Sequence, residues 1–264
     1  MIGAVIGDIV GSRFEFNNHR SKLFELFSKK CFVTDDSIMT IAVCDAILKA
    51  NGNYTNLSEL AVKSMQEIGR KYPDCGYGTS FLKWIFSKNP FPYESYGNGA
   101  AMRVSACGFA ATSIDEAKDL SYYVTRISHN HPEGMKGAEA VSVAIYLARD
   151  GKTKDEIRKA IEENYYRIDF TLDEIRLSYE FNETCQNTVP QAFEAFFESK
   201  DFEDAIRNAI SVGGDSDTLA AITGGIAEAY YGVPEKLRNT ALSYLDSNLL
   251  SIQKKFEERF PPTK

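Results

Sequence analysis

Two short acidic motifs from opposite parts of the chain carry the side chains best suited to chemistry. They are Thr34-Asp35-Asp36-Ser37 and Gly213-Gly214-Asp215-Ser216-Asp217-Thr218, and each stands directly before an apolar helical pattern. An Asp at a helix start accepts backbone N–H groups and interacts with the helix dipole, worth about 0.3–1 kcal/mol at an exposed site, so capping accounts for either motif alone. If the motifs meet, their carboxylates share one small volume and repel unless a cation neutralises them. Ligands that are all oxygens favour Mg²⁺, Mn²⁺ or Ca²⁺ over zinc.

The elements that must position these motifs are helices. Gly3, Gly7 and Gly11 recur at a four-residue spacing inside an apolar segment, and on a helix they form a ridge that another backbone can approach closely. Such packing compensates for the cost of glycine in a helix, about 0.5–1 kcal/mol. Gly224-Gly225, behind the second acidic motif, indicates the same kind of contact.

The remaining apolar patterns also have a helical period. Helices are expected over about 58–70, 100–111 and 235–256, and Pro190 fits the first turn of another. No sustained alternation of period two, no hairpin pair and no linker is present. The sequence therefore predicts an all-α fold, a single compact multi-helix domain spanning residues 1–264.

Composition excludes several classes of protein. The chain has 264 residues, 44% of them hydrophobic, and a net charge of −7 without a Lys/Arg block, which argues against binding to a nucleic-acid backbone. Five scattered cysteines without a C-x-x-C spacing predict a cytoplasmic, reducing location. The N-terminal stretch carries Asp8 and lacks a basic region, so no signal peptide is expected. No run of about 18 apolar residues is present, so no membrane span is expected.

Two loops and a histidine pair are further candidates. Residues 72–80 and 89–103 are rich in Gly and Pro; the first could cradle a phosphate through backbone N–H groups, although a simple loop is the commoner reason for such a pattern. His129 and His131 lie in Ser128-His129-Asn130-His131-Pro132. Structural hydrogen bonding is the commoner role for such histidines, and no zinc motif accompanies them.

Taken together, the motifs resemble the ADP-ribosylglycohydrolase family, which includes the dinitrogenase reductase-activating glycohydrolases. The blocks that match, in the family's order, are GAVIGDIVGSRFE, FVTDDSIMT, the GYG loop, YGNGAAMRVSA, SHNHPEGMKGAEA and SVGGDSDTLAAITGGIAEAYYG. The departures are small: Ser37 replaces a frequent threonine and Ala100 a frequent serine. The resemblance implies an all-α domain of the ADP-ribosylglycohydrolase type with a central dinuclear metal cleft.

The family's motifs place functional roles on particular residues. The resemblance implies that two Mg²⁺ or Mn²⁺ ions are held by Thr34, Asp35, Asp36, Asp215, Asp217 and Thr218, with Asp217 bridging. It implies that Glu15 lies on a mobile loop near the substrate ribose. The residues that it places around the diphosphate and distal ribose are Gly76, Tyr77, Gly78, Gly97, Asn98, Gly99 and Met102, with His131 bordering the same cleft.

The implied activity is metal-dependent hydrolysis of the glycosidic bond between ADP-ribose and an acceptor, which reverses ADP-ribosylation. The substrate would be an ADP-ribosylated protein or another ADP-ribose conjugate, a nucleic acid would serve only as a modified substrate, and a monomer is expected. Asp35, Asp36 or Glu15 would be the catalytic acid or base. The alternative is a non-catalytic ADP-ribose-binding protein of the same fold. Isoprenoid synthases also pair acidic motifs, but Ser37-Ile38-Met39 breaks the DDxxD spacing that they need.

Overall fold

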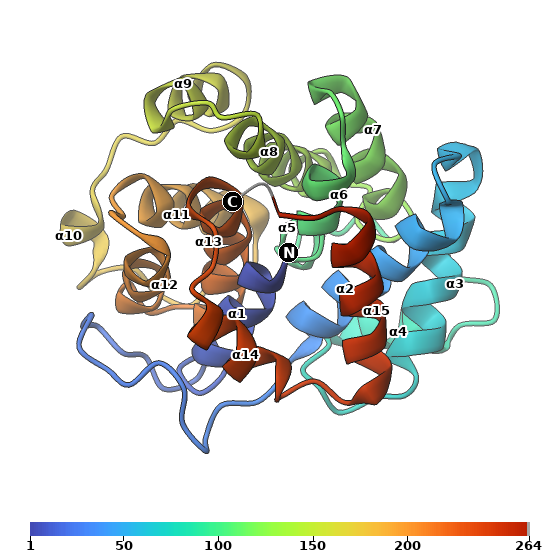
Figure 1. Cartoon of the computed structure of the whole chain (residues 1–264), viewed down its shortest axis with the longest axis horizontal. Helices are drawn as coiled ribbons and strands as arrows, with labels where there is room; N and C mark the ends of the chain where they lie inside the picture. The colour runs from blue at the N-terminus through green and yellow to red at the C-terminus, as the bar shows by residue number, and fades with distance from the viewer. Residues whose placement is uncertain (263–264) are drawn as a thin grey trace.

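Helices make up nearly all the regular structure of residues 1–262, the part of the chain that this computed structural model describes (Figure 1). The all-α prediction is confirmed. In chain order the elements are α1 (Ile2–Gly11), α2 (Asp35–Ala50), the 3₁₀ turn η1 (Tyr54–Asn56), α3 (Leu57–Gly69), α4 (Thr79–Phe86), α5 (Gly99–Met102), α6 (Ser105–Ala110), α7 (Ile114–Thr125), α8 (Pro132–Arg149), α9 (Lys154–Asn164), α10 (Leu172–Ile175), α11 (Cys185–Phe197), α12 (Phe202–Ser211), α13 (Ser216–Tyr231), α14 (Glu235–Leu242) and α15 (Ser247–Arg259). None of the helices in this range combines the length and the apolar character of a membrane span.

The pairing of α1 with α13 forms the centre of the molecule. A Cβ added at Gly7 would lie 1.9 Å from the carbonyl oxygen of Ala220, and one at Gly3 would lie 2.2 Å from that of Gly224. Only glycine allows the two backbones to come this close. The close contact predicted from the glycine spacing is therefore present.

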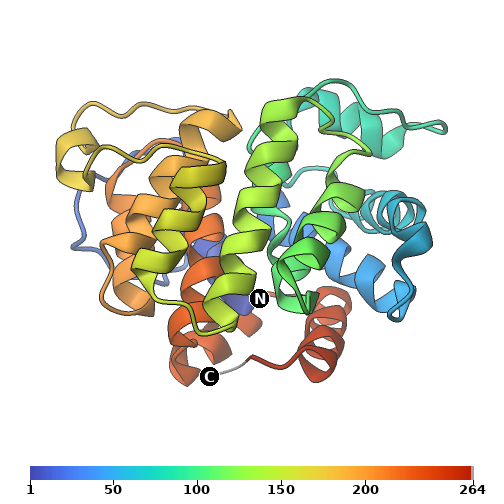
Figure 2. The same cartoon turned by 90° about the horizontal axis from the view of Figure 1, so that it is seen from above.

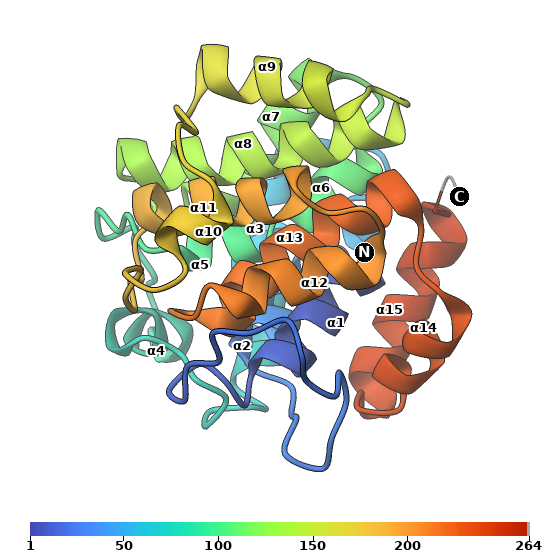
Figure 3. The ribbon, with the colours of Figure 1, turned by 90° about the vertical axis from the view of Figure 1, so that its left-hand side faces the viewer.

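The other helices cover this central pair from two sides. α11 and α12 pack against α13, whereas α2 packs against α1 on its other side and is covered by α3 and α15 (Figures 1 and 2). The long helix α8 contacts α13, α6 and α7 and runs across one face of the molecule (Figure 3). This arrangement brings the first turns of α2 and α13 next to each other, beside the C-terminal half of α1.

Three helix predictions need correction. The segment 100–111 forms two short helices, α5 and α6, because Arg103 and Val104 leave the helical path between them. The segment 235–256 is likewise divided into α14 and α15 by a turn at residues 243–246, where Asp246 caps the second helix. Pro190 lies inside α11 rather than in its first turn. Burial of the surrounding helix compensates for the backbone hydrogen bond that proline removes.

Candidate metal and ligand cleft

The two acidic motifs meet in a cleft of about 520 Å³. Asp35 and Asp36 enter it from the start of α2, and Asp215, Asp217 and Thr218 enter it from the start of α13. The hydroxyl of Thr218 donates to Asp36 Oδ2 over 3.1 Å, which joins the two motifs directly. Segments from opposite parts of the sequence thus form one site.

Local backbone geometry directs these carboxylates into the cleft. Gly213 and Gly214 have φ angles of 77° and 73°, in the left-handed region that glycine adopts without strain. The turn that they make starts α13 at Asp215, whose carboxylate does not cap its own helix and instead accepts a hydrogen bond of 2.7 Å from Asn98 Nδ2. Gly76, at φ 115°, lies so close to Asp35 that a Cβ there would be 2.8 Å from Asp35 Oδ1.

Asp8 is a buried member of the site that the sequence analysis did not assign. Its carboxylate accepts hydrogen bonds from the Ser37 hydroxyl, from the Thr34 hydroxyl at 2.6 Å and from the backbone N–H groups of Thr34 and Ser37 at 3.1 and 3.2 Å. Burial raises the pKa of Asp8 to about 6, although these hydrogen bonds lower it. α1 therefore holds the start of α2 in place through Asp8. A single charged residue in the middle of an apolar helix was the signal for this role.

The cleft carboxylates are crowded and poorly solvated. Burial, followed by the charges of Asp8 and Asp215, raises the pKa of Asp35 to about 8. Burial and neighbouring carboxylates also raise the pKa values of Asp36 and Asp217 well above the ordinary range. Asp36 Oδ1 and Asp217 Oδ1 are buried without a hydrogen-bond partner. A divalent cation would give these oxygens a partner and compensate their charge, so the donor set fits Mg²⁺ or Mn²⁺.

Glu15 joins the same group of carboxylates from the loop between α1 and α2. One oxygen each from Glu15, Asp215 and Asp217 lie within 4.8 Å of one another, close enough to hold one ion. Burial and the charge of Asp215 are the main causes that raise the pKa of Glu15 to about 7.

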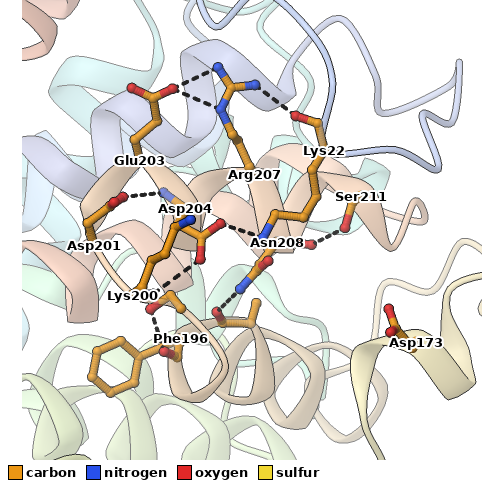
Figure 4. Close-up of polar contacts among 12 residues, drawn as sticks. Lys22, Asp173, Phe196, Lys200, Asp201, Glu203, Asp204, Arg207, Asn208 and Ser211 are labelled. Carbon is orange, nitrogen blue, oxygen red and sulfur yellow. Dashed lines mark hydrogen bonds and ion pairs between the residues drawn. The ribbon is translucent and has the colours of Figure 1, made fainter.

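The loop that carries Glu15 is fixed to α12 by side chains of that helix. Arg207 donates to the carbonyl oxygen of Lys22 at 2.8 Å and is itself held by Glu203 (Figure 4). It also donates to the carbonyl oxygen of Phe24 at 2.7 Å. The Lys22 ammonium pairs with Asp204 of the same helix (Figure 4). These contacts hold the part of the loop that follows Glu15 in sequence, and they do not involve Glu15 itself.

A buried arginine and a buried histidine also line the cleft. The loop around Gly97 and Gly99 lies against His129, because a Cβ at Gly99 would be 3.4 Å from His129 Nε2. Next to His129 is Arg103, which is fully buried, donates to Ser128 Oγ at 2.7 Å and stacks over the ring of Phe81. Its Nε and Nη1 have no hydrogen-bond partner. The sequence analysis assigned neither His129 nor Arg103 to the site, since nothing local marks either as facing a cleft.

The structure places most, but not all, of the predicted ligand residues in this cleft. Three do not line it: the hydroxyl of Thr34 is directed at Asp8, Tyr77 is buried against Phe81, and His131 caps α8 by accepting from the Glu133 N–H at 3.1 Å. The predicted residues that line it are Glu15, Asp35, Asp36, Gly76, Gly78, Gly97, Asn98, Gly99, Met102, Asp215, Asp217 and Thr218.

These features define an all-helical protein with a cleft that is lined by a group of carboxylates and by the buried guanidinium of Arg103. The chain belongs to the ADP-ribosylglycohydrolase family, whose sequence profile matches residues 1–261.

Characterised relatives match over nearly the whole chain. Human ADP-ribosylhydrolase ARH3 is 26% identical over 95% of this chain and 90% of its own length. The ADP-ribosylarginine hydrolase Tri1 of Pseudomonas putida is 24% identical over 98% of this chain and 76% of its own. Among solved structures, an ADP-ribosylglycohydrolase-related protein complex superimposes with a TM-score of 0.68 at 20% identity, covering 97% of this chain and 95% of that one. The last likeness establishes the fold alone.

Proposed function

We propose that this protein is a divalent-metal-dependent hydrolase that releases ADP-ribose from an acceptor to which it is glycosidically linked. The observation that carries the proposal is the pair of buried oxygens without partners, Asp36 Oδ1 and Asp217 Oδ1, in a cleft that also contains a buried guanidinium. A family that hydrolyses ADP-ribose linkages supports the same reaction.

The carboxylate end would hold the metal ions. Asp36, Asp215, Asp217 and Thr218 supply oxygens from two rigid helix starts, and Asp35 and Glu15 complete the wall. When bound, Mg²⁺ or Mn²⁺ supplies charge compensation, orients hydroxyl groups and makes a water molecule more acidic.

Proton transfer falls to a carboxylate that reaches both substrate and solvent. Glu15 and Asp35 are half-buried, whereas Asp36 is buried and accepts from Thr218. Glu15 or Asp35 therefore accepts a proton from the attacking water, whose oxygen forms the new bond to C1″ as the bond to the acceptor breaks. The same carboxylate then passes this proton to the departing acceptor atom, so that the OH of the water ends on C1″ and its hydrogen on the acceptor.

The part of the cleft around Arg103 fits a diphosphate. The buried guanidinium of Arg103 places a positive charge behind the cleft wall, and the small residues Gly97 and Gly99 let an anion approach the backbone. The aromatic rings of Phe81 and Tyr93 supply apolar surface beside them.

The test is release of free ADP-ribose from arginine-, serine- and nucleotide-linked substrates, each with Mg²⁺, with Mn²⁺ and with EDTA. We expect metal-dependent release from at least one linkage. Failure with every linkage, together with calorimetric binding of ADP-ribose, would replace this proposal with the non-catalytic binding protein.

A further inference from the structure

One guanidinium joins three segments of the chain at the turn that starts α13. Arg20, in the loop between α1 and α2, donates to the carbonyl oxygens of Val212 at 3.0 Å, of Tyr179 at 2.6 Å and of Arg176. Val212 directly precedes the Gly213–Gly214 turn, whereas the other two carbonyl groups belong to the segment between α10 and α11. Arg20 and these three carbonyl groups are called the Arg20 clasp below.

The clasp packs directly against the Gly213–Gly214 turn. A Cβ at Gly213 would lie 3.4 Å from Arg20 Cζ and 3.3 Å from Asn18 Cγ. A Cβ at Gly214 would overlap the ring of Tyr179. The turn that directs the carboxylates of α13 into the cleft is therefore in contact with both of the segments that Arg20 joins to it.

The loop that carries Arg20 also carries Glu15 to those carboxylates. Glu15 lies inside a closed turn, because the Asn17 N–H donates to the Phe14 carbonyl oxygen at 3.1 Å. The rings of Phe14 and His19 pack with centroids 5.0 Å apart, and His19 directly precedes Arg20. These contacts connect the position of Glu15, whose carboxylate lies within 4.8 Å of two carboxylates of α13, to the clasp.

A second arginine anchors the same loop in a different way. Arg207 of α12 donates to the carbonyl oxygens of Lys22 and Phe24, which follow Arg20 in sequence. Of the two arginines, only Arg20 donates to Val212, next to the turn that starts α13, within the described residues 1–262. Arg207 therefore provides a comparison for the effect of anchoring the loop in general.

We propose that Arg20 is a positioning residue, which holds Glu15 where its carboxylate shares a cation with Asp215 and Asp217. This inference rests on the metal site of the proposed function. The two aspartates are fixed by α13, whereas Glu15 lies on a loop and is repelled by them when no cation is bound. A guanidinium suits this role because its planar fork donates to several carbonyl oxygens at once.

The experiment measures the affinity of the full chain for Mn²⁺ by calorimetry, without substrate. Arg20→Met should weaken Mn²⁺ binding about tenfold, because groups that orient a metal ligand typically contribute at least this much to affinity. Arg207→Met is the matched control, since it removes a guanidinium that anchors the same loop, and it should change the affinity less than about twofold. Equal losses in the two variants would overturn the proposal, because anchoring of the loop in general would then be responsible.

A double-mutant cycle tests whether Arg20 acts through Glu15. Glu15→Gln removes the positioned ligand, so adding Arg20→Met to this variant should change Mn²⁺ affinity less than about twofold. A loss of about tenfold that persists without the Glu15 carboxylate would overturn the positioning role. Arg20→Lys keeps the charge but lacks the fork, so its affinity should lie between those of wild type and Arg20→Met. It replaces Arg20→Met in the cycle if urea denaturation in EDTA shows that Arg20→Met does not fold.

Turnover is measured separately, so that the positioning role and the hydrolase can fail independently. Release of ADP-ribose by wild type, with unchanged Mn²⁺ affinity in Arg20→Met, would overturn the role of Arg20 and leave the hydrolase intact. Weakened Mn²⁺ binding in Arg20→Met but not in Arg207→Met, in a protein that hydrolyses no linkage, would support the role of Arg20 and overturn the hydrolase. A wild-type protein that binds no Mn²⁺ would overturn both.

Discussion

Replacing Gly11 by alanine should damage stability and metal binding together. Gly11 ends α1 beside the first turn of α13, and an added Cβ would lie 2.5 Å from Asp217 Cα, 2.6 Å from the Ser216 carbonyl oxygen and 2.7 Å from Asp217 N. All three are backbone atoms, so no side-chain rotation relieves the contact. Ordinary contact begins at 3.4 Å, so the shortfall is 3.4 minus 2.5, or 0.9 Å, and the start of α13 has to move by about this distance.

The expected loss of stability follows from two opposing effects. Overpacking of a tight interior costs about 1–3 kcal/mol, and the better helix propensity of alanine returns up to about 1 kcal/mol. A net loss of about 1–2 kcal/mol lowers the melting temperature of a chain of this size by about 2–8 °C. Displacement of Asp217 weakens metal binding separately, and a tenfold weaker site removes about 1.4 kcal/mol of the stabilisation by saturating metal.

Urea denaturation in EDTA measures the first effect, and thermal melting during Mn²⁺ titration measures the second. Gly225→Ala is the matched control from α13, because its Cβ would meet only side-chain atoms of Ser105 at 3.2 Å and Ile145 at 3.4 Å. It should remain close to wild type in both assays. A Gly11→Ala protein with wild-type stability and wild-type Mn²⁺ response would refute the claim that close packing of α1 against α13 positions Asp217.

Four other perturbations test separate parts of the site. Asp217→Asn should abolish turnover and the thermal stabilisation by Mn²⁺, and wild-type rates would exclude its role as a shared metal ligand. In EDTA, thermal stability should fall as pH rises from about 5 to 8, because the raised pKa values of about 7 for Glu15 and about 8 for Asp35 mean that the folded state binds more protons than the unfolded state. Mg²⁺ should restore more stability at pH 8 than at pH 5. A melting temperature that does not change with pH in EDTA would contradict the argument that the carboxylates are crowded. Arg103→Met should weaken ADP-ribose binding in calorimetry by about tenfold while Mn²⁺ still raises the melting temperature, since the substitution removes the positive charge and leaves every carboxylate of the cleft in place. His131→Ala should cost about 1 kcal/mol in urea denaturation through loss of the α8 cap and leave ADP-ribose affinity unchanged, and a large affinity loss would return this histidine to the binding site.

Local patterns in the sequence predict the helices well and their partners less well. The spacing of Gly3, Gly7 and Gly11 predicts close packing, because a residue without a side chain recurs along one face of the helix. In the structure the backbone of α13 packs against this face. Pro190 was misplaced because a proline inside a helix costs a hydrogen bond that only tertiary packing offsets, and packing is not visible in the local pattern.

For the site, the sequence predicts the carboxylates but not their surroundings. Both acidic motifs have a composition that can be recognised in the sequence. The role of Arg103 depends on two guanidinium nitrogens that have no hydrogen-bond partner in the folded structure, and the sequence does not show this. The choice between His129 and His131 depends on one helix start: the residue before Pro132 caps α8, and its neighbour two positions earlier faces the cleft. Sequence spacing treats the two histidines as equivalent.

α1 explains why a fold this apolar keeps its carboxylates together. One face of the helix carries the glycines that fit against α13, and Asp8 on the same helix accepts four hydrogen bonds from Thr34 and Ser37 at the start of α2. The same buried element therefore fixes both acidic motifs, and apolar burial around it opposes their mutual repulsion. The positioning of both motifs therefore comes from the packing and the hydrogen bonds of α1. We therefore expect the glycines of α1 to be as necessary to the proposed activity as the carboxylates, because they allow α1 to pack directly against the start of α13.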